Sequence, residues 1–107
     1  MRNVLQENLV KIKKIASLNK VLSLYVFGSY AREQTNESSD LDVLLVTKDT
    51  DNPDEVSLKF TLGLFPRDYD LEVISCAFSD LQKKIQENSF FNTITKEGKL
   101  IYGSEIV

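Results

Sequence analysis

Histidine is absent from this sequence, and its absence removes several kinds of active site. A Ser-His-Asp triad, a histidine general acid or base and a histidine-ligated zinc ion all require this side chain. Cys76 is the only cysteine, so the chain can form neither an internal disulfide nor a site built from several thiolates. Cys76 lies beside an apolar run and is expected to be a small buried residue. Any catalysis must therefore use carboxylates, lysines, arginines, tyrosines, backbone amides or a bound metal ion.

A basic surface and a long hydrophobic segment are missing as well. The formal net charge is −3, and both signs are spread along the chain, so nothing predicts direct nucleic-acid binding. No apolar run approaches the roughly 20 residues of a membrane span, and the first residues lack the apolar core of a signal peptide. We therefore expect a cytoplasmic protein that does not bind membranes.

The residues that are present suffice for one domain covering positions 1–107, since 42% of them are apolar. Apolar spacing and capping residues predict helices over 3–18, 30–34, 53–64, from Ser79 onward, and 89–97. Apolar runs predict strands over 21–27, 41–46 and 69–75, with a short strand or extended tail at 100–102. This order predicts an α/β (α+β) fold in which a small mixed sheet packs against helices.

Asp40 and Asp42 stand two residues apart at the start of the strand predicted over 41–46. Side chains two apart on a strand share a face, and their Cα atoms would lie roughly 6.5 Å apart. Two carboxylates at this spacing can bind one cation or bridge two, and oxygen ligands suit Mg²⁺. Alternatively, Asp40 caps a turn and Asp42 is an exposed strand residue. Because Asp is a poor strand former and an unpaired carboxylate is costly in an apolar run, we favour the cation site.

Gly28 and Ser29 follow the strand predicted over 21–27. Glycine allows a backbone to approach a ligand closely, and the N–H groups at the start of a following helix favour phosphate. Ser29 adds a hydroxyl group. An ordinary Gly-Ser turn is the alternative, and the pair is not a P-loop because no Gly-Lys-Ser/Thr follows.

Asp70 and Glu72 share one face of the strand predicted over 69–75. If this strand lies beside the strand of Asp42, one of the two acids completes a cluster of three carboxylates. Clusters of this kind serve two-metal phosphoryl transfer.

Together, these features resemble the motif set of the minimal nucleotidyltransferases, within the DNA polymerase β nucleotidyltransferase superfamily. The matching residues are Gly28-Ser29, Arg32, Ser39-Asp40-Leu41-Asp42 and Asp70. The resemblance covers most of the chain and implies a nucleotidyltransferase-like fold. It implies that Gly28 and Ser29 hold the nucleotide phosphates, and that Arg32 either contacts phosphate or anchors the loop to an acid.

The same resemblance assigns the carboxylates. Asp40, Asp42 and Asp70 would be the catalytic residues and would bind Mg²⁺. Asp70 would also act as the base toward the acceptor hydroxyl, with Glu72 as the alternative for this third position.

By this resemblance, the chain moves a nucleoside monophosphate, AMP from ATP, to a hydroxyl group. Larger relatives hold the acceptor with an added helical domain, so we expect that surface to come from a second copy or a partner protein. Small members of the family are commonly antitoxins paired with a HEPN-domain toxin, which makes a tyrosine of the toxin the expected acceptor. Phe90 and Phe91 are expected in the core, with that partner interface as their alternative.

Two other functions remain open from the sequence. The chain could be a non-catalytic binding module that neutralises a partner by contact. It could also be an antibiotic-type nucleotidyltransferase that modifies a small molecule.

Overall fold

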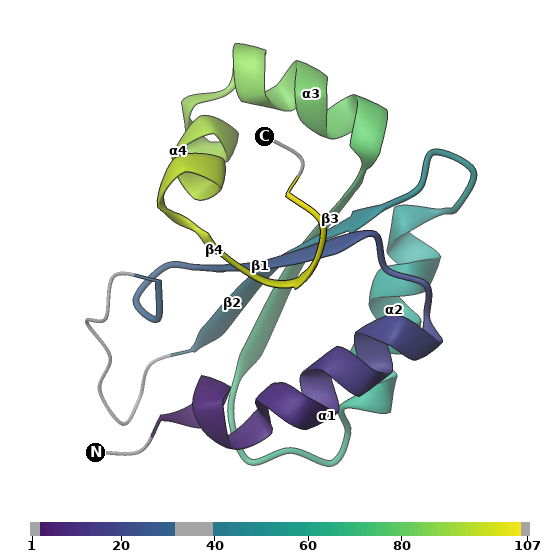
Figure 1. The fold of residues 1–107 in the computed structure, drawn as a ribbon, viewed down its shortest axis with the longest axis vertical. Coiled ribbons are helices and arrows are strands. Elements are labelled where there is room, and N and C mark those ends of the chain that lie inside the picture. Colours follow the sequence, from purple (N-terminus) through teal and green to yellow (C-terminus); the bar gives the residue numbers. More distant parts are fainter. Residues whose placement is uncertain (1–2, 32–39, 106–107) are drawn as a thin grey trace.

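Four strands form one mixed sheet with helices on both faces in the computed structural model, which describes residues 3–31 and 40–105 (Figure 1). The elements in chain order are α1 (Val4–Leu18), β1 (Ser23–Phe27), β2 (Leu41–Thr47), α2 (Pro53–Gly63), β3 (Leu71–Ala77), α3 (Phe78–Glu87), α4 (Ser89–Glu97) and β4 (Lys99–Gly103). The strand order across the sheet is β3-β2-β1-β4. β1 runs antiparallel to β2 and β4, whereas β2 and β3 are parallel. The predicted α+β fold with a small mixed sheet is therefore confirmed.

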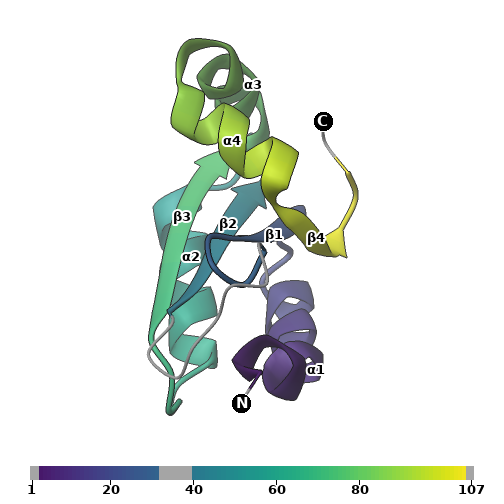
Figure 2. The ribbon, with the colours of Figure 1, turned by 90° about the vertical axis from the view of Figure 1, so that its left-hand side faces the viewer.

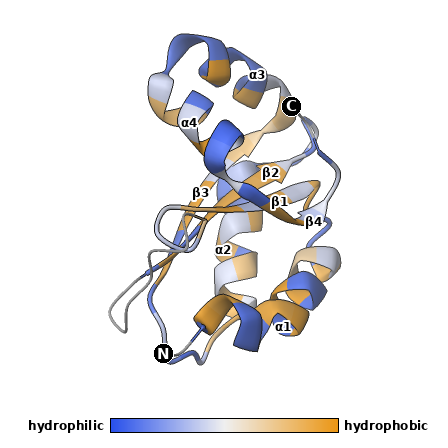
Figure 3. Ribbon diagram, turned by 60° about the vertical axis from the view of Figure 1, so that its left-hand side comes forward, coloured by the Kyte–Doolittle hydropathy of each residue, from blue (hydrophilic) through white to orange (hydrophobic). Residues whose placement is uncertain are grey.

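The two faces of the sheet are buried against different helices (Figure 2). On one face, Leu41, Val43 and Leu45 of β2 join a core with α1 and α2. On the other face, Leu44 and Val46 join a core with α3 and α4. This alternation follows from the two-residue period of a strand, and it makes β2 a central strand that is apolar on both sides. Hydrophobic colours accordingly follow the strands of the sheet (Figure 3).

Two predicted helix starts are confirmed in atomic detail. The Asn3 side chain accepts a hydrogen bond from the backbone N–H of Gln6 at 3.0 Å, which caps α1. The Asn52 side chain accepts from the backbone N–H of Asp54 at 2.9 Å, and Pro53 is the first residue of α2. Caps of this kind satisfy N–H groups that have no partner within the helix. No helix in the described part of the chain is long and apolar enough to cross a membrane.

The start of α3 differs from the prediction. The helix begins at Phe78, and no side chain of the capping residue bonds to it. The backbone N–H of Ser79 instead donates to a carboxylate oxygen of Asp49 at 2.9 Å. The cap therefore comes from the loop after β2, a long-range contact that local spacing around Ser79 could not reveal.

Two strand boundaries also shift. β1 begins at Ser23, because the backbone N–H of Val21 donates to Ala16 at the end of α1. β3 covers Leu71–Ala77 rather than 69–75, because it pairs residue by residue with β2 as far as the pair Thr47 and Ala77. Residues 28–31 form a turn, and the rest of the helix predicted over 30–34 lies outside the described residues. The segment at 100–102 belongs to β4, which pairs with β1.

Candidate functional site

The backbone of Gly28 lies directly against the side chain of Asp42. β1 ends at Phe27, which pairs with Asp42 across the antiparallel ladder, so the next residue passes over that carboxylate. A Cβ atom at position 28 would overlap Asp42 Oδ2 and would lie 3.3 Å from Asp42 Cγ. Gly28 also has φ +70°, a conformation that favours glycine. The structure therefore brings together the Gly-Ser turn and the second aspartate of the Asp-x-Asp pair, which are separated in sequence.

The strand next to β2 supplies the other acids. In the parallel ladder, Asp42 stands opposite Glu72, and neighbouring strands lie about 4.8 Å apart. Residues paired in this way present their side chains on the same face. Asp42 and Glu72 are thus cross-strand neighbours on the face covered by α3 and α4, the face of Leu44 and Val46.

Asp40 and Asp70 lie directly before the first residues of β2 and β3. The backbone N–H of Leu41 donates to the carbonyl oxygen of Asp70 at 2.9 Å, which ties the segment before β3 to the first residue of β2. Asp40 and Asp70 are both exposed. Their side chains therefore border the ladder end at which Asp42 and Glu72 are paired.

The predicted three-carboxylate cluster is not closed in the described residues, where no group of three or more acidic or cysteine side chains is close enough to hold a metal ion. Asp40, Asp70 and Glu72 are exposed, whereas Asp42 is half-buried. Like charges repel, which favours separate positions for these exposed carboxylates. The donor set is made of carboxylates alone, and this chemistry fits Mg²⁺.

Ser29 and Arg32 are the other two residues predicted to bind phosphate or to hold its loop. Ser29 is half-buried and belongs to the same turn as Gly28. Arg32, predicted to contact phosphate or to anchor the loop, lies outside the described residues. The roles of Gly28, Ser29 and Arg32 toward a nucleotide remain predictions.

Three aromatic rings, those of Phe27, Phe90 and Phe91, border Asp42, and only the place of Phe27 among them was missed from the sequence. Phe27, the ladder partner of Asp42, packs edge-on against Phe90 of α4 with 6.2 Å between ring centroids. Phe90 packs edge-on against Phe91 in turn, at 5.7 Å. Phe91 is buried as expected, but Phe90 is 48% exposed. In the sequence, the position of Phe27 directly before Gly28 was the only indication that this ring borders the candidate site.

Cys76 behaves as a buried structural residue. Its side chain lies in the core under α3 and α4. Burial raises the pKa of the Cys76 thiol to about 11, with Lys84 lowering it and Asp80 raising it. A thiol with this pKa stays protonated at neutral pH and is a weak nucleophile. The expectation of a small buried residue is confirmed.

Comparison with known proteins supports one family. The family model described as polymerase beta, nucleotidyltransferase, matches residues 10–106. A protein of Methanocaldococcus jannaschii, provisionally named a protein adenylyltransferase, is 50% identical over 42 residues. That match covers 38% of this chain and 43% of the archaeal protein, less than half of either.

Solved structures show the same fold. A chain from a toxin–antitoxin complex with AMP-PNP superposes with a TM-score of 0.58 at 24% identity, covering 92% of this chain and 75% of that one. A chain from the complex of tri-AMPylated Shewanella oneidensis HEPN toxin with MNT antitoxin gives a TM-score of 0.52 at 23% identity, covering 94% and 73%. Since the family model spans nearly the whole sequence and the fold is shared, this chain belongs to the polymerase β nucleotidyltransferase family.

Proposed function

We propose that this chain transfers AMP from ATP to a hydroxyl group on a protein, with Mg²⁺ as cofactor. The observation that carries the proposal is the packing of Gly28 against Asp42, with a second acidic strand directly beside it. A backbone without a side chain next to paired carboxylates is what a metal-bound triphosphate requires. Membership of the nucleotidyltransferase family supports the same reaction class.

The carboxylates would bind the metal ion, and the Gly-Ser turn would bind the phosphates. Asp40, Asp42 and either Asp70 or Glu72 would hold Mg²⁺, which supplies charge neutralisation for the phosphates. Gly28 and Ser29 would bind phosphate oxygens through backbone N–H groups and a hydroxyl.

The transfer itself is a displacement at phosphorus. The acceptor oxygen attacks the α-phosphorus of ATP, the bond from that phosphorus to the bridging oxygen breaks, and pyrophosphate leaves. The proton of the acceptor hydroxyl passes to the third carboxylate, for which Asp70 and Glu72 are the two candidates.

The acceptor we propose is a tyrosine of a HEPN-domain toxin, which would make this chain an antitoxin. The likeness in fold to chains from toxin–antitoxin complexes, one of them with an AMPylated HEPN toxin, supports this acceptor class. The exposed ring of Phe90 lies beside the Asp42 site through Phe27. Aromatic side chains, Phe among them, are enriched at protein–protein interfaces relative to the rest of the surface.

The test is a labelling experiment with the protein encoded beside this chain. The two purified proteins are incubated with ATP labelled on the α-phosphate and with MgCl₂. We expect label on the neighbour and a mass increase of one AMP group on a tyrosine. Asp42→Asn should abolish the label, and Asp80→Asn is the matched control because Asp80 is an exposed acid on α3.

Two outcomes would reject the transfer of AMP to a protein. One is neutralisation of the toxin by folded Asp42→Asn and Asp70→Asn variants, with no label on the toxin even from the unmodified chain. That result would identify a binding module that acts by contact. The other is transfer of AMP to small molecules alone, with the neighbouring protein unlabelled.

A further inference from the structure

α2 is apolar on its outer side as well as on the side that packs against the sheet. Phe60 is fully buried in the core beneath α1 and α2. Leu58 and Leu62 each stand two residues from Phe60, which is about 200° around a helix of 3.6 residues per turn. They therefore point away from that core, and their side chains are 59% and 62% exposed. A helix that is apolar on opposite sides is typical of a helix covered on both.

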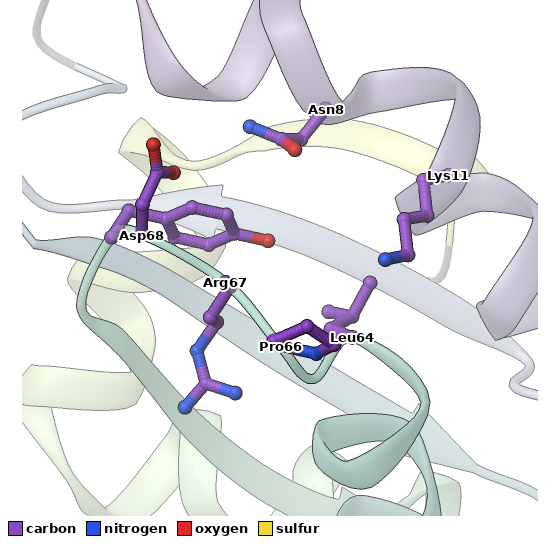
Figure 4. A pocket seen from close by; sticks show the side chains of 7 residues that line it. Asn8, Lys11, Leu64, Pro66, Arg67 and Asp68 are labelled. Carbon is purple, nitrogen blue, oxygen red and sulfur yellow. The ribbon is translucent and has the colours of Figure 1, made fainter.

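Phe65 continues this outer side beyond the end of α2. Its backbone N–H donates to the carbonyl oxygen of Leu62 at 3.1 Å, so the last turn extends through it. Its neighbours Leu64 and Pro66 line a cavity of about 380 Å³ against α1 (Figure 4). Phe65 does not line that cavity and is 70% exposed, so its ring is turned outward. Leu58, Leu62 and Phe65 thus form one apolar surface, which we call the outer α2 face.

The rim of the outer α2 face carries charges of both signs. Asp54 and Glu55 are exposed in the first turn of α2, and Lys59 is exposed one turn later. Leu18 at the end of α1 adds an apolar edge, since it is exposed and lines a cavity of about 290 Å³ with Glu55 and Lys59. A rim of both signs suits a partner that carries the same mixture, rather than a strongly acidic or strongly basic one.

We propose that the outer α2 face binds the same face of a second copy of this chain, with the two α2 helices antiparallel about a two-fold axis. The axis passes near the midpoint between Leu58 and Leu62, so that Leu58 of each copy packs against Leu62 of the other. By the same symmetry, Phe65 lies beside the first turn of the second α2.

Charge favours the antiparallel direction. In a parallel pair, the acidic first turns of both helices, each with Asp54 and Glu55, would lie together and repel. In the antiparallel pair these turns lie at opposite ends of the contact. The positive end of each helix dipole then lies beside the negative end of the other.

The size of the face suits a weak dimer. A standard interface buries about 800 Å² on each partner, with an apolar centre inside a polar rim. A two-fold contact uses the three apolar side chains of the outer α2 face twice, which supplies such a centre. We expect a dissociation constant of about 10 μM, so the chain is mainly monomeric at about 1 μM, the concentration at which its denaturation is measured.

This contact leaves the candidate site open. α2 packs on one face of the sheet, whereas α3 and α4 cover the other (Figure 2). Asp42 and Phe90 lie on the side of α3 and α4. A second copy on α2 therefore does not occupy the surface proposed for the acceptor, and the dimer does not depend on the proposed function.

Sedimentation equilibrium of the full chain without nucleotide tests the association. We expect mainly monomers at about 1 μM and mainly dimers at about 100 μM. Leu62→Glu should raise the dissociation constant at least tenfold, because it places a charge in the centre of the contact. Val10→Glu is the matched control and should leave the constant unchanged. Val10 is 84% exposed on α1 and stands about 140° around that helix from Ile15, which faces Gly63 of α2.

Disulfide cross-linking tests the direction of the helices. Leu58→Cys and Leu62→Cys chains are prepared separately, mixed and oxidised, with the unmodified chain as the control for the buried Cys76. We expect cross-links mainly between unlike variants, because position 58 lies opposite position 62 of the other copy. Like positions are offset by about 6 Å along the helices, which disfavours a disulfide between them.

Each measurement can overturn the proposal. A chain that stays monomeric at about 100 μM would reject the dimer. Protection of α2 from hydrogen exchange by the protein encoded beside this chain would then assign the face to that protein. Equal dimerisation of folded Leu62→Glu and Val10→Glu would place the contact elsewhere. Cross-links between like variants that form as fast as those between unlike ones would reject the antiparallel arrangement.

Discussion

Gly28 and Asp42 are so close that the carboxylate of Asp42 occupies the space where a side chain at position 28 would begin. The contact joins the end of β1 to β2 through the pairing of Phe27 with Asp42. It makes the glycine a requirement of both the fold and the proposed site, and the two requirements can be separated by experiment.

Gly28→Ala should lower the free energy of unfolding by about 2 kcal/mol, because alanine is strained at φ +70° and its methyl group meets Asp42. It should also abolish AMP transfer by displacing the Asp42 carboxylate. Gly103→Ala is the matched control, since Gly103 has φ +85° and its added Cβ would meet the backbone of Leu22 at the other end of β1.

Urea denaturation and the labelling assay together measure these effects. Both variants should lose stability, and only Gly28→Ala should lose transfer at a temperature where it is folded. Full transfer by folded Gly28→Ala would show that the close approach of this backbone is not needed.

Asp70→Asn should reduce AMP transfer about 100-fold or more, and Glu72→Gln by less than about tenfold. Asp70 lies at the open entrance of the strands beside Asp40, where an acceptor hydroxyl can approach. The measurement is the initial rate of label transfer at saturating ATP and Mg²⁺. The reverse ranking in two folded variants would assign the third carboxylate to Glu72, which stands opposite Asp42 in the ladder.

Leu44→Ala should lower the free energy of unfolding by about 3 kcal/mol. Leu44 is 0% exposed in the core under α3 and α4, so its truncation leaves a cavity. Leu58→Ala is the control, because Leu58 on α2 is 59% exposed, and its loss should stay within about 0.5 kcal/mol. Urea denaturation followed by circular dichroism measures both, and similar losses would contradict the two-sided burial of β2.

The Cys76 thiol should make stability fall at high pH. Its pKa is raised from 9.0 to about 11 in the folded protein, so the folded state retains a proton that the unfolded state releases. The stabilisation is complete below pH 9.0 and is lost as the pH rises toward about 11.

Urea denaturation at several pH values tests this linkage. Between the two pKa values, Cys76→Ala should lose less unfolding free energy than the unmodified chain, with a difference of about 1 kcal/mol. The raised pKa of Tyr69 acts in the same direction and remains in both proteins, so only the difference between them reports on Cys76. Parallel pH curves would contradict the burial of the thiol.

Features that depend on neighbours in the chain could be predicted from the sequence. The caps at Asn3 and Asn52 use side chains and N–H groups within three residues of each other, so spacing alone reveals them. α4 begins at Ser89 and ends at Glu97, as predicted from apolar spacing before Gly98. Where a cap comes from a distant loop, as Asp49 does for α3, the sequence pattern at Ser79 suggested a different first residue.

The sequence by itself determined the chemistry of the candidate site. It has no histidine and one cysteine, and it carries an Asp-x-Asp pair whose members share a face by strand geometry. The residue types restrict the side-chain metal ligands of the candidate site to oxygen atoms. The shared face of the two aspartates follows from the two-residue period of a β-strand.

Only the tertiary structure decided which of these residues meet. The parallel register of β2 and β3 sets Glu72 opposite Asp42 and ties Asp70 to Leu41. The antiparallel register of β1 and β2 carries Gly28 over Asp42. Register depends on how two hydrophobic faces pack against helices far away in the chain, and a shift of β2 by one residue would turn Asp42 to the opposite face from Glu72. The pairing of the strands therefore decides which acids are neighbours, and this pairing is a property of the tertiary structure.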